Sequence, residues 1–313
     1  MSKKIQDLVI IGAGPSALTA AVYAAREDID TLLFERSAIG GMAAITDMID
    51  NYPGFPDGVS GYDIATKMQK QAERFGAKIE FGEVSSVRDN GETKIVTVDG
   101  KDIEAKVVLI ATGSSFSKIN VPGEAEYYGR GVHYCATCDG AFYKNKSAVV
   151  IGGGNSAIQE AMFLTRFATH IDVVSLFDLT ASEVLQKELQ KYIDDGTIAV
   201  HTNTVTKEIV ACDDKVRAVR VEKDNKTFDI STDGVFIFIG LKPNTQFLKD
   251  SQIKLDERGF IKTDCKLQTN IPGIFASGDV RSGATMQVAS AVGEGATVSI
   301  SIREYLSDII KNR

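Results

Sequence analysis

Short apolar runs alternate with segments of helical periodicity at the start of the chain. Residues 8–11 are Leu-Val-Ile-Ile, and a glycine-rich turn separates them from apolar positions at helical spacing over 16–26. A second apolar run, Thr-Leu-Leu-Phe-Glu, follows at 31–35. Because strands buried on both faces have continuous apolar sequences, this succession predicts a strand–helix–strand unit.

The same pattern returns 140 residues later. Residues 8–17 are LVIIGAGPSA and residues 148–157 are AVVIGGGNSA. A helical pattern follows the second copy over 156–168, and an apolar run occupies 171–176. Each copy places Gly-x-Gly-x-x-Ala between a strand and a helix, the turn with which Rossmann units bind a dinucleotide pyrophosphate. Two copies in the right context are much stronger evidence than one.

The rest of the chain continues this alternation. Further apolar runs that lead into glycine-containing turns predict strands at 107–113, 235–240 and 271–280. Alternating polar and apolar positions predict antiparallel strands within 79–98 and 198–230, and helical spacing predicts a last helix over 284–308.

We therefore predict an α/β protein with two Rossmann-like, three-layer domains, the second inserted in the first. A chain of 313 residues is long enough for two domains. The predicted first domain is discontinuous and comprises residues 1–117 and 246–313, and the second comprises 118–245.

Composition narrows the class of protein. The chain is 43% hydrophobic and 25% charged, which excludes a disordered or fibrous chain. A net charge of −7 without a Lys/Arg block argues against nucleic acid and anionic membranes as partners. Lys3 and Lys4 precede an apolar run that ends at Gly12, which is too short for a signal peptide or a membrane span. We expect a cytoplasmic protein.

The strand ends differ between the two copies. Glu35 lies 23 residues after Gly12, where a carboxylate accepts hydrogen bonds from a ribose; the alternative is a merely solvated side chain. The matching position after Gly152 begins the sequence Ser-Leu-Phe at 175–177, and no Lys or Arg occurs over 171–186. A 2′-phosphate needs a cationic fork, so the second site lacks the usual specificity element for it.

A Cys-x-x-Cys pair precedes the second glycine-rich turn. Cys135 and Cys138 are followed directly by Asp139. Two such thiols close a small disulfide ring that exchanges readily, and the carboxyl group beside it is a candidate general acid or base. The remaining cysteines, Cys212 and Cys265, stand alone, and we interpret them as buried or incidental thiols.

A zinc site is the alternative for the same pair. It would use His133, Cys135 and Cys138 as ligands. A fourth ligand is missing, because the other histidines, His170 and His201, have no metal-type spacing. Redox use is favoured, and His133 is interpreted as a packing or loop residue.

These motifs together resemble the low-molecular-weight thioredoxin reductases, which are FAD-dependent pyridine nucleotide-disulfide oxidoreductases. The resemblance spans nearly the whole chain and rests on GAGPSA, the GG pair at 40–41, NYPGF at 51–55, ATG at 111–113, CATCDG at 135–140, GGGNSA at 152–157 and GIFASGDV at 273–280. CATCDG immediately before the second turn is the most specific of them.

The resemblance implies that the first domain binds FAD and that the second is NAD(P)-binding-like. The residues implied for FAD are Gly12, Gly14, Pro15, Ser16, Ala17, Glu35, Gly40, Gly41, Asn51, Ala111, Thr112, Gly113, Gly278, Asp279 and Gln287. Those implied for a pyridine nucleotide are Gly152, Gly154, Asn155 and Ser156.

The resemblance also implies the catalytic roles. Cys138 would be the thiol beside the flavin, Cys135 the one that attacks the partner disulfide, and Asp139 the acid. Thioredoxin or a similar small redox protein would be the partner. The enzyme would be a homodimer whose small domain swings to alternate between hydride delivery and disulfide exchange.

Three departures from the family concern the cofactor sites. Ser-Leu-Phe at 175–177 replaces the usual His-Arg-Arg, Met42 replaces a Gln, and Met286 replaces an Arg. Losing two arginine–phosphate contacts disfavours NADPH. NADH remains conceivable because its pyrophosphate needs only the second turn, and ferredoxin or a reduced deazaflavin are other donors to consider.

Three other functions are alternatives to this one. A ferredoxin–NAD(P) reductase typically lacks the Cys-x-x-Cys, and a peroxide-reductase partner typically has an extra N-terminal redox domain. A flavin protein without a donor, acting as a redox sensor or binding module, is the alternative from another class.

Overall fold

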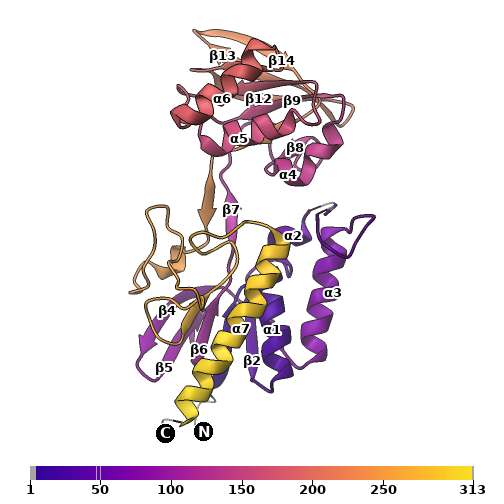
Figure 1. The fold of residues 1–313 in the computed structure, drawn as a ribbon. Helices are drawn as coiled ribbons and strands as arrows, with labels where there is room; N and C mark the ends of the chain where they lie inside the picture. Colours follow the sequence, from indigo (N-terminus) through magenta and orange to yellow (C-terminus); the bar gives the residue numbers. More distant parts are fainter. Residues whose placement is uncertain (1–4, 47, 50, 312–313) are drawn as a thin grey trace. The chain divides into compact units, whose positions relative to one another are not determined.

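The computed structural model describes residues 5–46, 48–49 and 51–311. The chain forms two compact units, Met1–Ser115 with Lys242–Arg313 and, inserted between them, Phe116–Leu241 (Figure 1). Both units are α/β and have parallel sheets, so the predicted fold class is confirmed.

The first unit contains a seven-stranded sheet in the order β3-β2-β1-β6-β5-β4, with β17 also paired to β6. The pairs among β3, β2, β1 and β6 are parallel, whereas β4 and β5 add antiparallel strands. Its elements are β1 (Gln6–Ile11), α1 (Pro15–Arg26), β2 (Thr31–Glu35), α2 (Gly41–Ala44), α3 (Gly61–Arg74), β3 (Lys78–Phe81), β4 (Val84–Asn90), β5 (Thr93–Val98), β6 (Lys101–Ile110), η2 (Gln246–Leu248), β17 (Ile274–Ala276) and α7 (Val288–Lys311).

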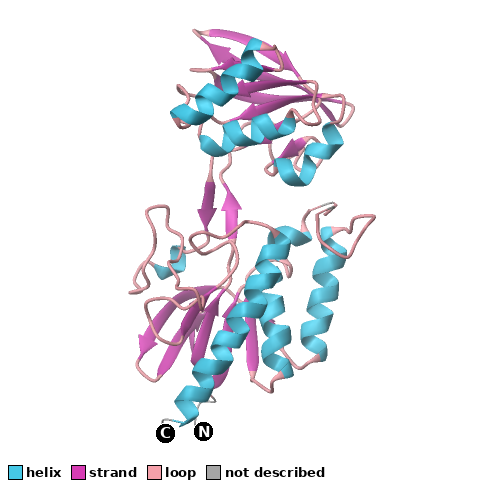
Figure 2. Ribbon diagram, viewed as in Figure 1, coloured by secondary structure: helices cyan, strands magenta, loops and turns pink. Residues whose placement is uncertain are grey.

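Alternate residues of the central strands fill two separate cores. Leu8 and Ile10 of β1 face a core shared with α1 and α7, while Val9 and Ile11 face the core on the opposite side of the sheet. Since successive side chains of a strand point to opposite faces, burial of both sets explains the unbroken apolar sequence. Figure 2 shows α1, α3 and α7 together on one face of this sheet.

The second unit has a five-stranded parallel sheet in the order β11-β10-β9-β15-β8 and a three-stranded antiparallel sheet, β12-β13-β14. Its elements are β8 (Val132–His133), α4 (Ala136–Asp139), η1 (Gly140–Tyr143), β9 (Ser147–Ile151), α5 (Asn155–Leu164), β10 (His170–Val174), α6 (Glu183–Asp194), β11 (Ile198–His201), β12 (Val205–Cys212), β13 (Lys215–Lys223), β14 (Lys226–Ser231) and β15 (Val235–Ile237).

The parallel sheet of this unit lies between two different layers. Val150 and Val173 pack with the helices α5 and α6, and Val149 and Val174 pack with the antiparallel sheet. The unit is therefore a three-layer body with the second glycine-rich turn at the carboxyl end of β9.

Two strand predictions were wrong in direction. β3 pairs with β2 in parallel, and β11 pairs with β10 in parallel, although both stretches were predicted to be antiparallel. Each follows a helix, α3 or α6, that the sequence analysis did not recognise, and a strand that returns after a helix lies parallel to the strand before it. The antiparallel prediction is confirmed for β4 with β5 and for β12 to β14.

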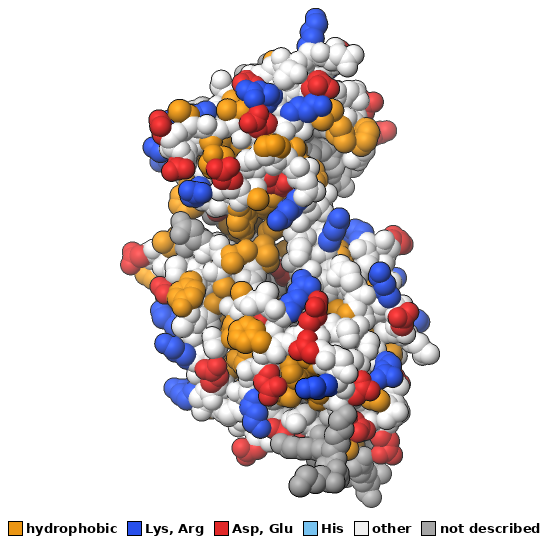
Figure 3. All heavy atoms as spheres, turned by 180° about the vertical axis from the view of Figure 1, so that it is seen from behind, with side chains coloured by type: hydrophobic (Ala, Val, Ile, Leu, Met, Phe, Trp, Pro, Cys, Tyr) orange, Lys and Arg blue, Asp and Glu red, His pale blue; other side chains and the backbone are white. Residues whose placement is uncertain are grey.

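The chain passes between the units twice, through β7 (Ser114–Phe116) and β16 (Leu241–Pro243), which pair with each other. Among the described residues, no helix is long and apolar enough to cross a membrane. On the face shown in Figure 3, basic and acidic side chains are interspersed over each unit.

Candidate functional site

The first glycine-rich turn lies between β1 and α1. Gly12 has a φ of +101°, and a Cβ there would be 2.5 Å from the carbonyl oxygen of Ala111. A Cβ on Gly14 would meet no atom within 4 Å, so the start of α1 faces open space. The Gly40-Gly41 pair packs against one side of this turn. The Gly40 N–H donates to the Ala13 carbonyl, and a Cβ on Gly41 would be 3.6 Å from the Gly14 Cα.

The carboxylate of Glu35 is fixed at the end of β2. It is 8% exposed and accepts the Ala13 N–H at 2.9 Å and the Ser37 N–H at 2.9 Å, together with the Ser37 hydroxyl at 3.2 Å. A carboxylate offers about four acceptor positions, so one remains for a further donor.

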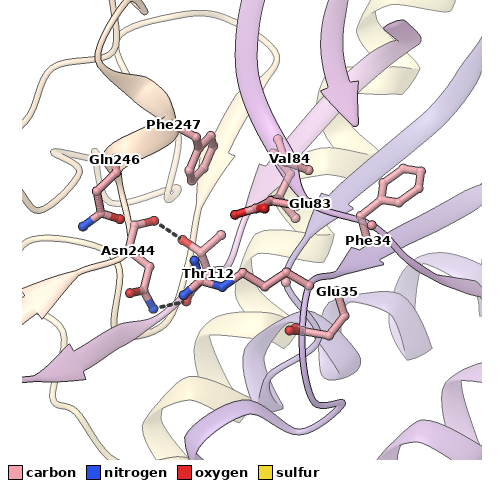
Figure 4. Close-up of a pocket in the computed structure, with 12 residues that line it drawn as sticks. Phe34, Glu35, Glu83, Val84, Thr112, Asn244, Gln246 and Phe247 are labelled. Atoms are coloured by element: carbon pink, nitrogen blue, oxygen red, sulfur yellow. Dashed lines mark hydrogen bonds between the residues drawn. The ribbon is translucent and has the colours of Figure 1, made fainter. Parts of the chain in front are cut away.

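A cavity of about 120 Å³ opens beside this carboxylate. Thr112 and Asn244 lie side by side in its wall: Asn244 Nδ2 donates to the Thr112 carbonyl at 2.8 Å, and Thr112 Oγ1 donates to the Asn244 carbonyl at 2.8 Å (Figure 4). The sequence analysis missed Asn244, which lies in the loop after β16. Other lining residues are Ile11, Gly12, Phe34, Arg36, Gly82, Glu83, Val84, Gln246 and Phe247.

Asp279 follows β17 and is largely buried. Burial raises the pKa of its carboxyl group to about 6, and the nearby charge of Glu294 adds to the shift. In the described chain this carboxyl group has no hydrogen-bond partner. Gly278, the residue before it, has a φ of +73° and would place a Cβ 3.1 Å from that of Ser16, so the Asp279 segment lies beside the first turn.

Other predicted residues are also gathered in this unit. Asn51 Nδ2 donates to Gln287 Oε1 at 2.9 Å, although 236 positions separate them. Met286, just before Gln287, has a φ of +58°. Ser16 uses its hydroxyl in a 2.6 Å hydrogen bond with that of Ser277, and Ala17 is fully buried in the core.

These features fit a dinucleotide such as FAD. The first turn offers bare backbone at the start of a 12-residue helix, which suits a pyrophosphate. Glu35 retains an acceptor position, and the partly buried carboxyl group of Asp279 could accept a hydrogen bond from a ligand hydroxyl.

The second glycine-rich turn has the same backbone form. Gly152 has a φ of +141°, and a Cβ there would be 2.4 Å from the Phe238 carbonyl oxygen. Gly154 is open apart from Thr180 Oγ1, which would be 3.8 Å from its Cβ. Asn155 accepts the Ser182 N–H at 2.8 Å, and Ser156 is exposed.

The loop after β10 closes against this turn. Thr180 and Ala181 both donate backbone N–H groups to the Gly153 carbonyl, at 2.8 and 3.1 Å. The loop exposes Leu176 and Phe177, by 54% and 67%, where a phosphate-binding loop would present cations.

The Cys-x-x-Cys pair lies in the second unit at the start of α4. Cys135 and Cys138 form a disulfide. The backbone N–H of Cys138 donates to Cys135 Sγ at 3.2 Å, and that of Asp139 donates to the Cys135 carbonyl at 3.1 Å. The turn therefore holds both sulfurs together and points a donor at one of them.

The side chain of Asp139 contacts a buried histidine. Its Oδ2 is 3.2 Å from His133 Nδ1, and His133 Nε2 is 2.8 Å from the hydroxyl of Tyr143. The sequence analysis considered His133 as a zinc ligand or, preferably, a packing or loop residue, and did not mention Tyr143. The spacing His-x-Cys-x-x-Cys-Asp was visible, but nothing in it distinguishes a hydrogen-bonded histidine from a packed one.

A zinc site finds no support in the structure. No group of three or more His, Cys, Asp or Glu side chains among the described residues could hold a metal ion. Cys212 and Cys265 are free, exposed thiols.

Comparisons with a family model, with curated proteins and with solved structures each match nearly the whole chain. The pyridine nucleotide-disulphide oxidoreductase family pattern matches residues 6–295. A thioredoxin reductase from Listeria innocua is 42% identical over 310 residues, covering 98% of this chain and 96% of that protein. A Clostridium pasteurianum protein described as the 34.2 kDa protein in the rubredoxin operon is 38% identical, covering 97% and 98%. The crystal structure of thioredoxin reductase from Streptococcus pyogenes matches with a TM-score of 0.92 and 40% identity, covering 98% and 100%.

Proposed function

The chain belongs to the pyridine nucleotide-disulphide oxidoreductases, in the low-molecular-weight thioredoxin reductase family, and on that premise we propose that it reduces thioredoxin or a thioredoxin-like protein with electrons from a donor other than NADPH. The observation that carries the reductase function is the Cys135–Cys138 disulfide with Asp139 beside it. The relatives named as thioredoxin reductases support thioredoxin as the partner.

FAD, when bound, supplies the electron pair that reduces the disulfide. The first unit would hold it through the open turn at Gly12 and Gly14, the remaining acceptor position of Glu35, and Asp279. The two carboxyl groups come from the ends of different strands, β2 and β17, so binding depends on the folded sheet.

The two cysteines would then divide the exchange between them. The Cys138 N–H, 3.2 Å from Cys135 Sγ, stabilises a thiolate at Cys135, which makes Cys135 the better nucleophile toward a partner disulfide. The resulting mixed disulfide is resolved by Cys138, whose attack restores the internal disulfide and releases the reduced partner. Asp139 exchanges the proton that Cys138 gains or loses.

The loop after β10 is the reason to exclude NADPH as the main donor. The described residues 171–186 contain no Lys or Arg but include Asp172, Asp178 and Glu183. A 2′-phosphate carries a charge that acidic side chains repel and that only cations or N–H donors offset. The open backbone of Gly154 leaves room for the pyrophosphate of NADH, and a reduced iron–sulfur protein such as ferredoxin is the other donor that we propose to test.

The test is anaerobic reduction of the purified flavoprotein, followed by the loss of flavin absorbance. NADPH, NADH, reduced deazaflavin and reduced ferredoxin are compared at matched concentrations. We expect NADPH to reduce the flavin far more slowly than at least one other donor. Saturation with micromolar NADPH would contradict the proposal, because another cation would then bind its phosphate.

A further inference from the structure

Three polar side chains form a row of close contacts next to the Cys-x-x-Cys turn. Asp139 Oδ2 lies 3.2 Å from His133 Nδ1, and His133 Nε2 lies 2.8 Å from the Tyr143 hydroxyl. His133 is 7% exposed, and its ring stacks on Phe236 with centroids 5.1 Å apart, while Tyr143 meets it edge-on. The packing holds the imidazole in one orientation, with one nitrogen toward Asp139 and the other toward Tyr143.

The hydrogen bond to Tyr143 determines which imidazole nitrogen carries the proton. Burial and the charges of Asp139 and Asp233 raise the pKa of Tyr143, so its hydroxyl keeps its proton and donates it to Nε2 of His133. A neutral imidazole that accepts at Nε2 has its proton on Nδ1, the nitrogen that lies 3.2 Å from Asp139 Oδ2.

We propose that His133, supported by Tyr143, positions the carboxylate of Asp139 for proton exchange with Cys138. This proposal rests on the proposed thiol–disulfide exchange. It gives the buried histidine a role beyond packing.

The step balances in atoms and electrons. Cys138 loses its S–H proton to the carboxylate of Asp139, and its sulfur attacks Cys135 Sγ in the mixed disulfide. The Cys135–Cys138 bond forms while the bond from Cys135 to the partner's sulfur breaks, and that sulfur leaves with the electron pair. The stored proton then passes to the partner's thiolate. The cysteines are oxidised and the partner is reduced.

Other charges surround the row without replacing His133. Tyr128 has a raised pKa, from burial and from the charge of Asp139. Lys146 Nζ lies 5.6 Å from the centre of the Tyr143 ring. Glu160, the one ionisable side chain on α5, which packs against α4, has a carboxyl pKa raised by burial. Among the described residues, His133 is the side chain within ion-pair distance of the Asp139 carboxylate.

The test isolates the thiol chemistry from the electron donor and from thioredoxin. The cysteine pair is reduced with dithiothreitol, which is then removed under anaerobic conditions. Stopped-flow reaction with a small aromatic disulfide is followed from mildly acidic to mildly basic pH. Variants His133→Ala, His133→Asn and Tyr143→Phe are compared with the wild type, and Asp139→Asn serves as the variant without the carboxylate.

His133→Ala should move the acid limb of the pH–rate profile upward, because the carboxylate loses its close polar contact with Nδ1. His133→Asn, whose amide N–H can take the place of Nδ1–H, should bring the limb back toward the wild type. Tyr143→Phe should give a smaller upward shift, and Asp139→Asn should remove the limb. A merely structural histidine would lower the rate or the stability without moving the limb.

Profiles of His133→Ala and Tyr143→Phe that superimpose on the wild type after scaling would overturn the proposal. If His133→Ala does not fold, Tyr143→Phe and His133→Asn decide between the same outcomes. A wild-type enzyme that reduces the small disulfide but not thioredoxin would refute the proposed partner and leave the role of His133 standing.

Discussion

Restoring cations to the loop after β10 should give the protein a working NADPH site. The double substitution Leu176→Arg/Phe177→Arg changes two side chains that are 54% and 67% exposed, so the core is untouched. The loop keeps its shape because it is held by backbone hydrogen bonds from Thr180 and Ala181 to the Gly153 carbonyl. The variant therefore tests charge at this position and little else.

The expected size of the effect follows from the exposure. A hydrogen bond to a charged group contributes about 1.5–3 kcal/mol when shielded. Solvent screening at these exposed positions reduces each contact to about 1 kcal/mol. Two contacts then give about 2 kcal/mol, which corresponds to a roughly 30-fold lower Kd for NADPH.

The assay is a titration of the flavoprotein with NADPH and with NADH, together with the concentration dependence of flavin reduction. The matched control is Leu176→Gln/Phe177→Gln, which removes the same apolar surface without adding charge. NADPH binding should tighten in the arginine variant only, should weaken again at high salt, and NADH binding should change little. An equal gain for both nucleotides, or in the glutamine control, would refute the reasoning that the missing charge excludes NADPH.

Three further predictions concern single residues. Cys138→Ser should abolish disulfide turnover while the flavin absorbance stays, and loss of FAD would instead indicate a structural role. Glu35→Gln should lower the free energy of urea unfolding by about 1–2 kcal/mol, because the N–H groups that Glu35 accepts would lose an anionic acceptor, and should weaken FAD binding; an unchanged FAD affinity would count against its role. Asp279 has a folded pKa raised to about 6, so the native apoprotein binds the extra proton and its stability should fall as pH rises toward neutrality. Asp279→Asn should remove that fall and stabilise the apoprotein at neutral pH by about 2 kcal/mol, whereas parallel stability curves would contradict the assignment.

Sequence pattern predicted the parts of the fold that obey local rules. The glycine-rich turns at Gly12 and Gly152 follow from apolar strands, tight turns and helices in succession, and both turns formed with the positive φ that glycine allows. The direction of β3 and β11 was predicted wrongly, because it depends on the preceding helices α3 and α6. Those helices have few buried residues, and their patterns were passed over beside the stronger apolar strands.

The site residues could be predicted where they lie close together in one short sequence motif. Cys135, Cys138 and Asp139 are neighbours in sequence, so a thiol–disulfide function could be predicted for them without a structure. The pairing of His133 with Tyr143 joins residues 10 positions apart through the end of a strand and a 3₁₀ turn, and Asn244 reaches Thr112 across 132 positions. Such contacts depend on the tertiary fold, and no periodicity in the sequence indicates them.

If a flavin in the first unit passes two electrons to the Cys135–Cys138 disulfide, these electrons must leave as thioredoxin thiols. A single-turnover experiment follows both events. The enzyme is reduced under anaerobic conditions by light and deazaflavin, mixed with oxidised thioredoxin, and assayed for flavin reoxidation and new thiols on the partner. We expect two free partner thiols for each pair of electrons in the wild type, whereas Cys138→Ser should stop at a mixed disulfide between Cys135 and the partner with its flavin still reduced. Protein that binds no flavin, or a reduced flavin that reoxidises without forming partner thiols, would contradict it.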